Sequence, residues 1–231
     1  MISVLTITYK RHHLLEEAIE SFLRQESRND KNEMVIINDN PEVDYVYEHS
    51  QIRIINHKQR FPSISSKIEW GYKICNNPYI YRLDDDDLLA PWALINVESD
   101  IINNPGYDIY RSSGMYFFLN NQIQSESDNV NNGNVYSKNY LDRIEFPDLS
   151  GTEDANITFH HNAKIYRSNL LHTMIYRWGM NTFHISGMGT QPNNVILEQA
   201  DRVLDNRKGT IQLDPKFIED YYGQLNKYIS K

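Results

Sequence analysis

Cysteine is almost absent from this sequence of 231 residues, in which Cys75 is the only one. A single thiol excludes an intramolecular disulfide and a cysteine-based zinc site, and both exclusions favour a reducing compartment. The chain opens on a strand-like segment that lacks the basic start and apolar run of a secretion signal. We therefore expect a cytoplasmic protein, in which Cys75 is a small buried apolar residue rather than a nucleophile.

The sequence has fewer basic than acidic residues, and it has no long apolar run. The 23 Lys and Arg residues against 31 Asp and Glu give a net charge of −8, whereas nucleic-acid-binding proteins carry clustered basic residues. No stretch approaches the ~18 consecutive apolar residues of a transmembrane helix. The length suits one domain, so we expect a single domain over residues 1–231, without a nucleic-acid partner or a transmembrane segment.

The first hundred residues alternate between short apolar runs, typical of strands, and helical patterns. In residues 14–23, apolar side chains recur in adjacent pairs every four residues, as in an amphipathic helix. This alternation predicts an α/β fold, with a mostly parallel central sheet and helices on both faces. The expected strands are 2–8, 34–37, 52–55 and 79–83, and the expected helices are about 14–23, 63–75 and 91–103.

The pattern becomes less regular after residue 106, although no linker marks a separate domain. Asn120 and Asn121 divide two apolar runs and predict a hairpin, and the polar stretch 125–134 predicts a loop. The further elements that we expect are strands at 107–111, 115–119, 122–124 and 162–166, and helices at 194–204 and 215–228.

Polar residues follow three of the predicted strands, at 8–11, 38–39 and 84–87. Ligands of open α/β sheets bind outside the carboxyl ends of the strands, so these three segments should lie along one functional edge. Thr8, Tyr9, Lys10 and Arg11 offer a hydroxyl, an aromatic face and two cations, or they simply form the loop before a helix. Asp39 can accept hydrogen bonds from a nucleobase or a ribose, or it can cap a turn beside Pro41.

Four adjacent aspartates, Asp84 to Asp87, give the strongest chemical signal. Four neighbouring carboxylates repel one another, and a cation offsets that repulsion. Alternate carboxylates at a strand end, those of Asp84 and Asp86, can place oxygens around one hard divalent ion, which can bridge a diphosphate. The alternative is a solvated acidic turn.

Three segments together resemble the opening of family 2 glycosyltransferases. Residues 2–11 read Ile-Ser-Val-Leu-Thr-Ile-Thr-Tyr-Lys-Arg, and the following helix ends in Ser-Phe-Leu-Arg-Gln at residue 25. Residues 34–39 resemble the second strand of that family with its nucleotide-contacting aspartate, and residues 83–91 resemble its Asp-x-Asp metal motif. The resemblance implies a GT-A fold, with a nucleotide-sugar-binding half at about 1–106 and an acceptor-binding half at about 107–231.

The resemblance also implies roles for single residues. Within the donor site, Asp39 would contact the base, Lys67 the base or a phosphate, and Asp84 the ribose. Asp86 would bind a divalent metal ion, Mn²⁺ or Mg²⁺. The full set of implied nucleotide-sugar-binding residues is Thr8, Tyr9, Arg11, Asp39, Lys67, Asp84 and Asp85.

The catalytic base is harder to assign. The family places an acidic pair after a strand and helix start that residues 162–171 resemble, and no such pair follows them here. Asp154, in the pair Glu153-Asp154 before that segment, is the best candidate for the base, in a loop after Gly151-Thr152; the alternative is a helix-capping box. His184 is a candidate metal ligand, because His-x-x-Gly late in the chain resembles a ligand motif of other GT-A families. The alternatives are that His160-His161 supplies this ligand, or that His184 has a structural role.

These features predict a metal-dependent glycosyltransferase, hexosyl or related, that uses a nucleotide-sugar donor such as a UDP- or GDP-sugar. The expected acceptor is a hydroxyl group of a glycan or glycoconjugate. One alternative is a sugar-1-phosphate nucleotidyltransferase, although residues 8–11 lack the glycine-rich loop that this activity requires. Another is a non-catalytic nucleotide- or glycan-binding protein of the same fold. The sequence leaves the donor sugar, the stereochemical outcome and the oligomeric state open.

Overall fold

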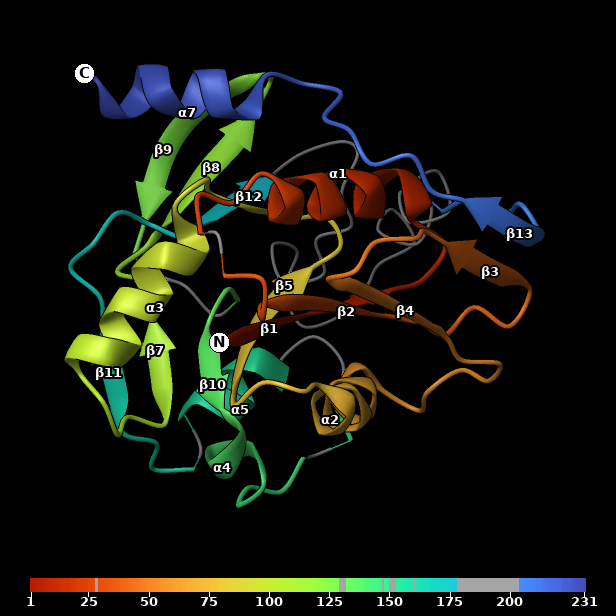
Figure 1. Cartoon of the computed structure of the whole chain (residues 1–231), viewed down its shortest axis with the longest axis horizontal. Coiled ribbons are helices and arrows are strands. Elements are labelled where there is room, and N and C mark those ends of the chain that lie inside the picture. The colour runs from red at the N-terminus through yellow and green to blue at the C-terminus, as the bar shows by residue number, and fades with distance from the viewer. Residues whose placement is uncertain (28, 129–131, 147, 150–152, 160, 178–203) are drawn as a thin grey trace.

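In the computed structural model, seven strands within the described residues form the central sheet (Figure 1). In spatial order they are β11 (Ile165–Arg167), β7 (Ile109–Arg111), β10 (Val135–Ser137), β5 (Tyr79–Asp84), β1 (Ile2–Thr8), β2 (Glu33–Asn38) and β4 (Ile52–Asn56). All neighbouring pairs are parallel except the two that include β10. The predicted α/β fold with a mostly parallel sheet is therefore confirmed. The structure describes residues 1–27, 29–128, 132–146, 148–149, 153–159, 161–177 and 204–231.

Helices cover both faces of this sheet. Successive side chains of a strand point to opposite sides, so a strand with apolar side chains on both sides needs a covering layer on each face. In β1, Val4 lies in the apolar cluster that includes Leu15, whereas Leu5 lies in the cluster that includes Ile68. Figure 1 accordingly shows the first two helices on opposite sides of the sheet. One face carries α1 (His12–Leu23) and α3 (Ala93–Asn103), and the other carries α2 (Ile64–Ile74), α4 (Lys138–Leu141) and α5 (Glu153–Phe159).

Four strands within the described residues form a second sheet next to the first. Its strands, in spatial order, are β6 (Leu88–Leu89), β12 (Met174–Arg177), β8 (Met115–Leu119) and β9 (Gln122–Ser127). The turn of the β8–β9 hairpin has positive φ angles at Asn120 (51°) and Asn121 (61°), which asparagine tolerates better than most residues. The predicted hairpin is therefore confirmed. The last helix, α7 (Tyr221–Ile229), packs its apolar face on this sheet.

The end of the chain returns to its beginning. Strand β13 (Gly209–Gln212) pairs in parallel with β3 (Val43–Val46), and the segment between β13 and α7 then crosses α1 (Figure 1). Along this crossing, the backbone N–H groups of Asp214 and Ile218 donate to the carboxylates of Glu16 (2.9 Å) and Glu17 (3.0 Å) of α1. Residues 204–231 are thus attached to β3, with which β13 forms a separate two-stranded sheet, to α1 and, through α7, to the second sheet.

The structure differs from the sequence predictions in several places. The helix expected at 215–228 begins only at Tyr221, where the side chain of Asp220 caps it by accepting from the N–H of Gly223. The loop expected around Asp154 is instead the first turn of α5. Strands β3, β6, β10, β12 and β13 were not predicted, because each is too short to show alternation. Most of the predicted helix at 194–204 lies outside the described residues. None of the helices in the described ranges is long and apolar enough to cross a membrane.

Cys75 lies at the end of α2, where it is 3% exposed. Burial raises the pKa of its thiol to about 12, so the thiolate is not available at neutral pH. The prediction of a buried apolar role is confirmed.

Replacing Leu225 by alanine should destabilise the whole fold. Leu225 is fully buried with Tyr116 and Ile175, so the lost contacts and the remaining cavity should lower the free energy of unfolding by ~2–5 kcal/mol. The matched control is Ile218→Ala, since Ile218 is 68% exposed and should contribute little. Urea unfolding followed by circular dichroism measures both effects. If the urea midpoint of the unfolding transition were the same in Leu225→Ala as in the wild-type protein, α7 would not unfold together with the rest of the fold.

Candidate functional site

The polar segments that follow three strands meet at one edge of the central sheet. Thr8 at the end of β1 lies in register with Asn38 at the end of β2, and Ile7 lies in register with Asp84 at the end of β5. Lys10, in the loop after β1, has a positive φ of 55°, which turns the chain from the strand into α1. The expected common edge is therefore present.

The four aspartates form a tight turn at this edge. The N–H of Asp87 donates to the carbonyl of Asp84 (3.3 Å), and this closure gathers carboxylate oxygens of Asp84, Asp86 and Asp87 within 4.8 Å of one another. Burial raises the pKa of Asp87 well above its ordinary value. A group of three carboxylates, of which those of Asp86 and Asp87 are buried, fits a hard divalent ion such as Mg²⁺ or Mn²⁺, which prefers oxygen ligands.

Asp85 is not part of that group. Both of its carboxylate oxygens accept from the guanidinium of Arg11, which also donates to Asp86 through Nη1 (2.9 Å). Burial nevertheless raises the pKa of Asp85 to about 6, because the cost of desolvation exceeds the stabilisation by Arg11. Asp85 therefore orients Arg11, a role that the alternation of carboxylates along the sequence did not reveal.

Two further side chains bind the acidic turn from the side of the central sheet. Arg82, buried within β5, donates to Asp84, and Asn132 donates to Asp84 (2.6 Å) and Asp87 (2.8 Å). The sequence does carry a signal for Arg82, because a charged residue inside an apolar strand next to an acidic run needs a partner.

Arg177 binds the backbone of the acidic turn. Its buried guanidinium donates to the backbone carbonyls of Asp85 (3.3 Å) and Asp86, and it pairs with Glu17 of α1, which is 1% exposed. Its backbone N–H also donates to the carboxylate of Asp87 (3.3 Å). Arg177 thus ties the second sheet and α1 to the acidic turn. No sequence pattern indicated it, because its partners are far apart in the chain.

Asp39 is buried at the end of β2 and accepts three hydrogen bonds. Its Oδ1 atom accepts from Lys67 (2.6 Å) and Arg60 (2.8 Å), and its Oδ2 atom accepts from the backbone N–H of Phe61 (3.1 Å). The guanidinium of Arg60 also lies over the ring of Tyr9, with its Cζ atom 3.6 Å from the ring centroid. The structure therefore brings Asp39, Lys67 and Tyr9 together, and it adds Arg60, which the sequence analysis missed.

Lys67 is held on two sides. Its ammonium group donates to the backbone carbonyl of Thr8 (2.7 Å) as well as to Asp39. Burial lowers the pKa of Lys67 to about 8, although Asp39 opposes the shift. A binding event that brings a negative charge to this ammonium would favour its protonated form.

Asp154 lies in the first turn of α5, close to the acidic turn. Burial of its carboxyl raises its pKa to about 8, against the opposing effect of Arg82, and the negative charge of Asp84 raises it further. Its Oδ1 atom is buried and has no hydrogen-bond partner in the described part of the chain. The pair Glu153-Asp154 also follows a strand-and-helix segment, β10 with α4, so an acidic pair after such a segment is present in this chain.

His184, the candidate metal ligand, lies outside the described residues, as does His160. Among the described residues, the one group of three or more His, Cys, Asp and Glu side chains that could hold a metal ion is Asp84, Asp86 and Asp87. The described His161 is not part of it.

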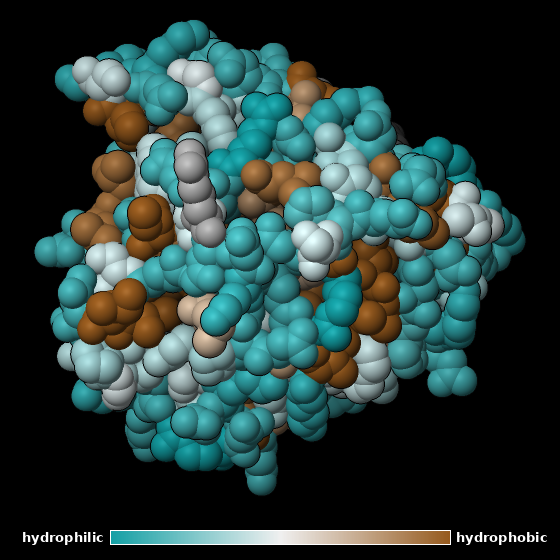
Figure 2. All heavy atoms as spheres, in the orientation of Figure 1, coloured by the Kyte–Doolittle hydropathy of each residue, from teal (hydrophilic) through white to brown (hydrophobic). Residues whose placement is uncertain are grey.

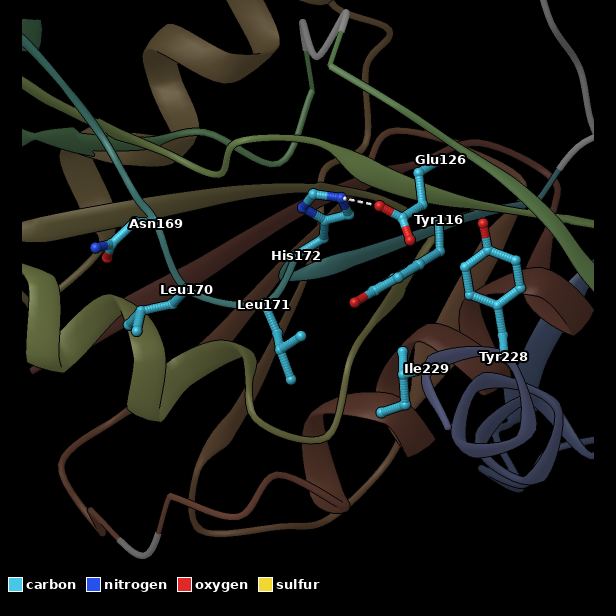
Figure 3. Close-up of a pocket in the computed structure, with 8 residues that line it drawn as sticks. All are labelled: Tyr116, Glu126, Asn169, Leu170, Leu171, His172, Tyr228 and Ile229. Carbon is cyan, nitrogen blue, oxygen red and sulfur yellow. Dashed lines mark hydrogen bonds and ion pairs between the residues drawn. The ribbon is translucent and has the colours of Figure 1, made fainter. Parts of the chain in front are cut away.

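A shallow pocket lies elsewhere on the molecule, between the β8–β9 hairpin, the segment before β12 and the end of α7 (Figure 3). His172 and Glu126 form an ion pair or hydrogen bond there (2.9 Å), beside Tyr116 and Tyr228. His172 precedes β12, whereas Arg177 at the other end of that strand contacts the acidic turn. The pocket is therefore separate from the strand-end site.

Comparison with known proteins gives a family and a set of related folds. A family model described as glycosyl transferase family 2 matches residues 3–173. No curated protein sequence matches the chain. Among solved structures, residues 1–349 of TarS from S. aureus in complex with UDP-GlcNAc are 15% identical, with a TM-score of 0.64 over 99% of this chain and 72% of that one.

Two further structures extend this comparison. TarS 1–349 in another crystal structure is 15% identical, with a TM-score of 0.60 over 76% of this chain, and this chain covers 60% of its length. A mannosyltransferase from Pyrobaculum calidifontis, PcManGT, in complex with GDP-Man and Mn²⁺ is 11% identical, with a TM-score of 0.55 over 87% of this chain and 68% of that one. At these identities, the likeness shows a shared fold.

Replacing Arg177 by methionine should destabilise the fold by leaving the buried charge of Glu17 without its ion-pair partner. Removing one partner of a buried ion pair costs about 3–5 kcal/mol, and the double variant Glu17→Gln/Arg177→Met should recover part of that loss. Chemical unfolding of both variants measures the difference. The control Arg143→Met, which breaks an exposed pair with Asp108, should cost less than about 1 kcal/mol. Equal stability of the single and the double variant would contradict the importance of the pair.

Proposed function

The chain is a member of glycosyl transferase family 2, and we propose that it transfers a sugar from a nucleoside diphosphate sugar to a hydroxyl group of an acceptor. Its fold is of the GT-A type that the sequence predicted. The observation that carries the proposal is the convergence of Asp39, Lys67, Asp86 and Asp154 at one edge of the central sheet. Complexes of TarS with UDP and UDP-GlcNAc, and of PcManGT with GDP-Man and Mn²⁺, support a UDP- or GDP-sugar donor.

The nucleoside would bind at the ends of β1 and β2. The ring of Tyr9 offers a stacking face, and Asp39 offers a carboxylate acceptor for an N–H group of the base. Lys67, between Asp39 and the carbonyl of Thr8, offers a cation to the base or to a phosphate. Arg11, oriented by Asp85, completes the lining toward the acidic turn.

Asp84, Asp86 and Asp87 would hold a divalent ion, Mn²⁺ or Mg²⁺, with Asp84 also a candidate contact for the ribose. When bound, such an ion neutralises charge that develops on the diphosphate leaving group. Arg82 and Asn132 fix the carboxylates of Asp84 and Asp87, Arg11 binds that of Asp86, and Arg177 binds the backbone of the turn. His184 remains a proposed further ligand.

Asp154 is the proposed general base. A carboxylate with a pKa near 8 is a stronger base than an ordinary aspartate, and it can still be deprotonated near neutral pH. Asp154 would take the proton of the acceptor hydroxyl as that oxygen bonds to the anomeric carbon and the bond from this carbon to the diphosphate breaks. The positive charge of Arg82 interacts with both Asp84 and Asp154 and partly offsets their negative charge.

The acceptor, a glycan or glycoconjugate, would approach from the half of the chain formed by residues 107–231, and the donor would bind the half formed by residues 1–106. The chain spans less than two thirds of TarS 1–349 in two of its structures and 37% of a longer TarS chain, so the complete activity is proposed only by its class.

Replacing Asp86 by asparagine should remove the metal dependence of nucleotide binding. We expect the wild-type protein to bind UDP or GDP more tightly in Mn²⁺ than in EDTA, because the diphosphate and the acidic turn repel each other without a cation. Loss of one charged ligand should weaken binding in Mn²⁺ by roughly 10-fold or more. Titration calorimetry measures these affinities, with Asp44→Asn, at an exposed ion pair, as the control. Equal wild-type affinity in EDTA and Mn²⁺ would contradict the metal site.

Replacing Asp154 by asparagine should slow transfer by about 10²–10⁴-fold while leaving nucleotide binding unchanged, because the amide cannot accept the proton. For the wild-type protein, kcat/KM should rise with pH and level off above about 8, since the base must be deprotonated. The variant should lack this rise. Transfer rates measured from pH 5.5 to 9.5 test both points, and a wild-type rate in Asp154→Asn would assign the base elsewhere.

A further inference from the structure

The carboxylate of Asp39 is covered by its own hydrogen-bond donors in this structure. Lys67 and Arg60 both donate to Oδ1, and the N–H of Phe61 donates to Oδ2, while Asp39 itself is 2% exposed. Oδ2 retains a second lone pair, but at 2% exposure an N–H group of a nucleobase can reach this carboxylate only if a group that covers it moves away.

The three donors differ in how firmly they are held. The Lys67 side chain is 6% exposed and is also bound to the carbonyl of Thr8. Phe61 donates through its backbone, and its ring packs against His57 (4.6 Å between centroids) and Trp70 (5.6 Å). The Arg60 side chain, in contrast, is 51% exposed. Arg60 is therefore the donor that can leave at the lowest cost.

The guanidinium of Arg60 resembles a nucleobase in its shape and in the contacts that it makes. It is planar, it lies 3.6 Å above the ring of Tyr9, and it directs an N–H group at Asp39. A nucleobase is also planar, and stacking on Tyr9 with donation to Asp39 are the two contacts that the proposed function gives to the base.

We infer that Arg60 occupies the place of the nucleobase and is displaced when a nucleotide binds. This inference rests on the proposed function. Arg60 keeps Asp39 paired and covers Tyr9 in the nucleotide-free protein, so it competes with the base for both contacts. A ligand without a base cannot replace these contacts, and it gains nothing from the departure of Arg60.

The inference predicts that Arg60→Ala binds UDP more tightly than the wild-type protein does. The gain in Mn²⁺ should be roughly 5- to 30-fold, the range expected for one ion pair whose cation is half exposed and one cation–π contact. Arg60→Lys should gain less, because an ammonium still pairs with Asp39 but does not cover the ring. The matched control is Lys58→Ala, which removes a nearby exposed cation that pairs with Asp44, and it should leave the affinity unchanged.

Inorganic pyrophosphate in Mn²⁺ serves as the probe without a base, and its affinity should be the same for the wild-type protein and Arg60→Ala. Titration calorimetry with UDP, GDP and pyrophosphate separates the outcomes. Tighter nucleotide binding with unchanged pyrophosphate binding supports the inference. Equal or weaker UDP binding by Arg60→Ala overturns the inference and leaves the donor site standing. Failure of all the proteins to bind either nucleotide overturns the donor site and this inference together.

Discussion

The repulsion among four adjacent carboxylates is the constraint on which the rest of the site depends. A turn of Asp84 to Asp87 at the end of a buried strand is stable only if cations and N–H donors surround it. Arg11 comes from the loop after β1, Arg82 from β5 itself and Arg177 from β12. The acidic turn therefore joins the two sheets and α1, and its geometry follows from the positions of these partners rather than from the local sequence.

The sequence predicted what local periodicity and strand direction determine. The apolar runs and helical stripes of the first hundred residues located β1, α1, β2, β4, α2, β5 and α3, and parallel strands then brought Thr8, Asp39 and Asp84 to one edge. It did not predict which way each aspartate turns, since Asp85 and Asp86 have the same neighbours in the chain and differ only in their tertiary contacts. Arg177 and Glu17 are 160 residues apart, and no pattern within a window of the sequence connects them.

The base candidate illustrates a different limit. The pair Glu153-Asp154 was identified, but it was placed in a loop, because the two residues before it suggested a break and the helix that follows has only seven residues. The short strand β10 was not predicted, so the segment before the pair was not recognised as a strand and helix. Short elements are fixed by pairing with neighbours, here β5 and β7, and such pairing leaves little trace in hydrophobic periodicity.

The return of the chain end to β3 and α1 also has a consequence for how the protein is made. During synthesis, β1, β2 and the acidic turn emerge from the ribosome well before Arg177 and β13, which follow much later in the sequence. Until then, Glu17 has no guanidinium partner, the acidic turn lacks its backbone support, and β3 has an open edge. Contacts of such long sequence separation also close slowly. While only the first half of the chain has been synthesised, its unpaired strand and unsupported acidic turn are exposed. The protein therefore depends most on protection from aggregation at that stage.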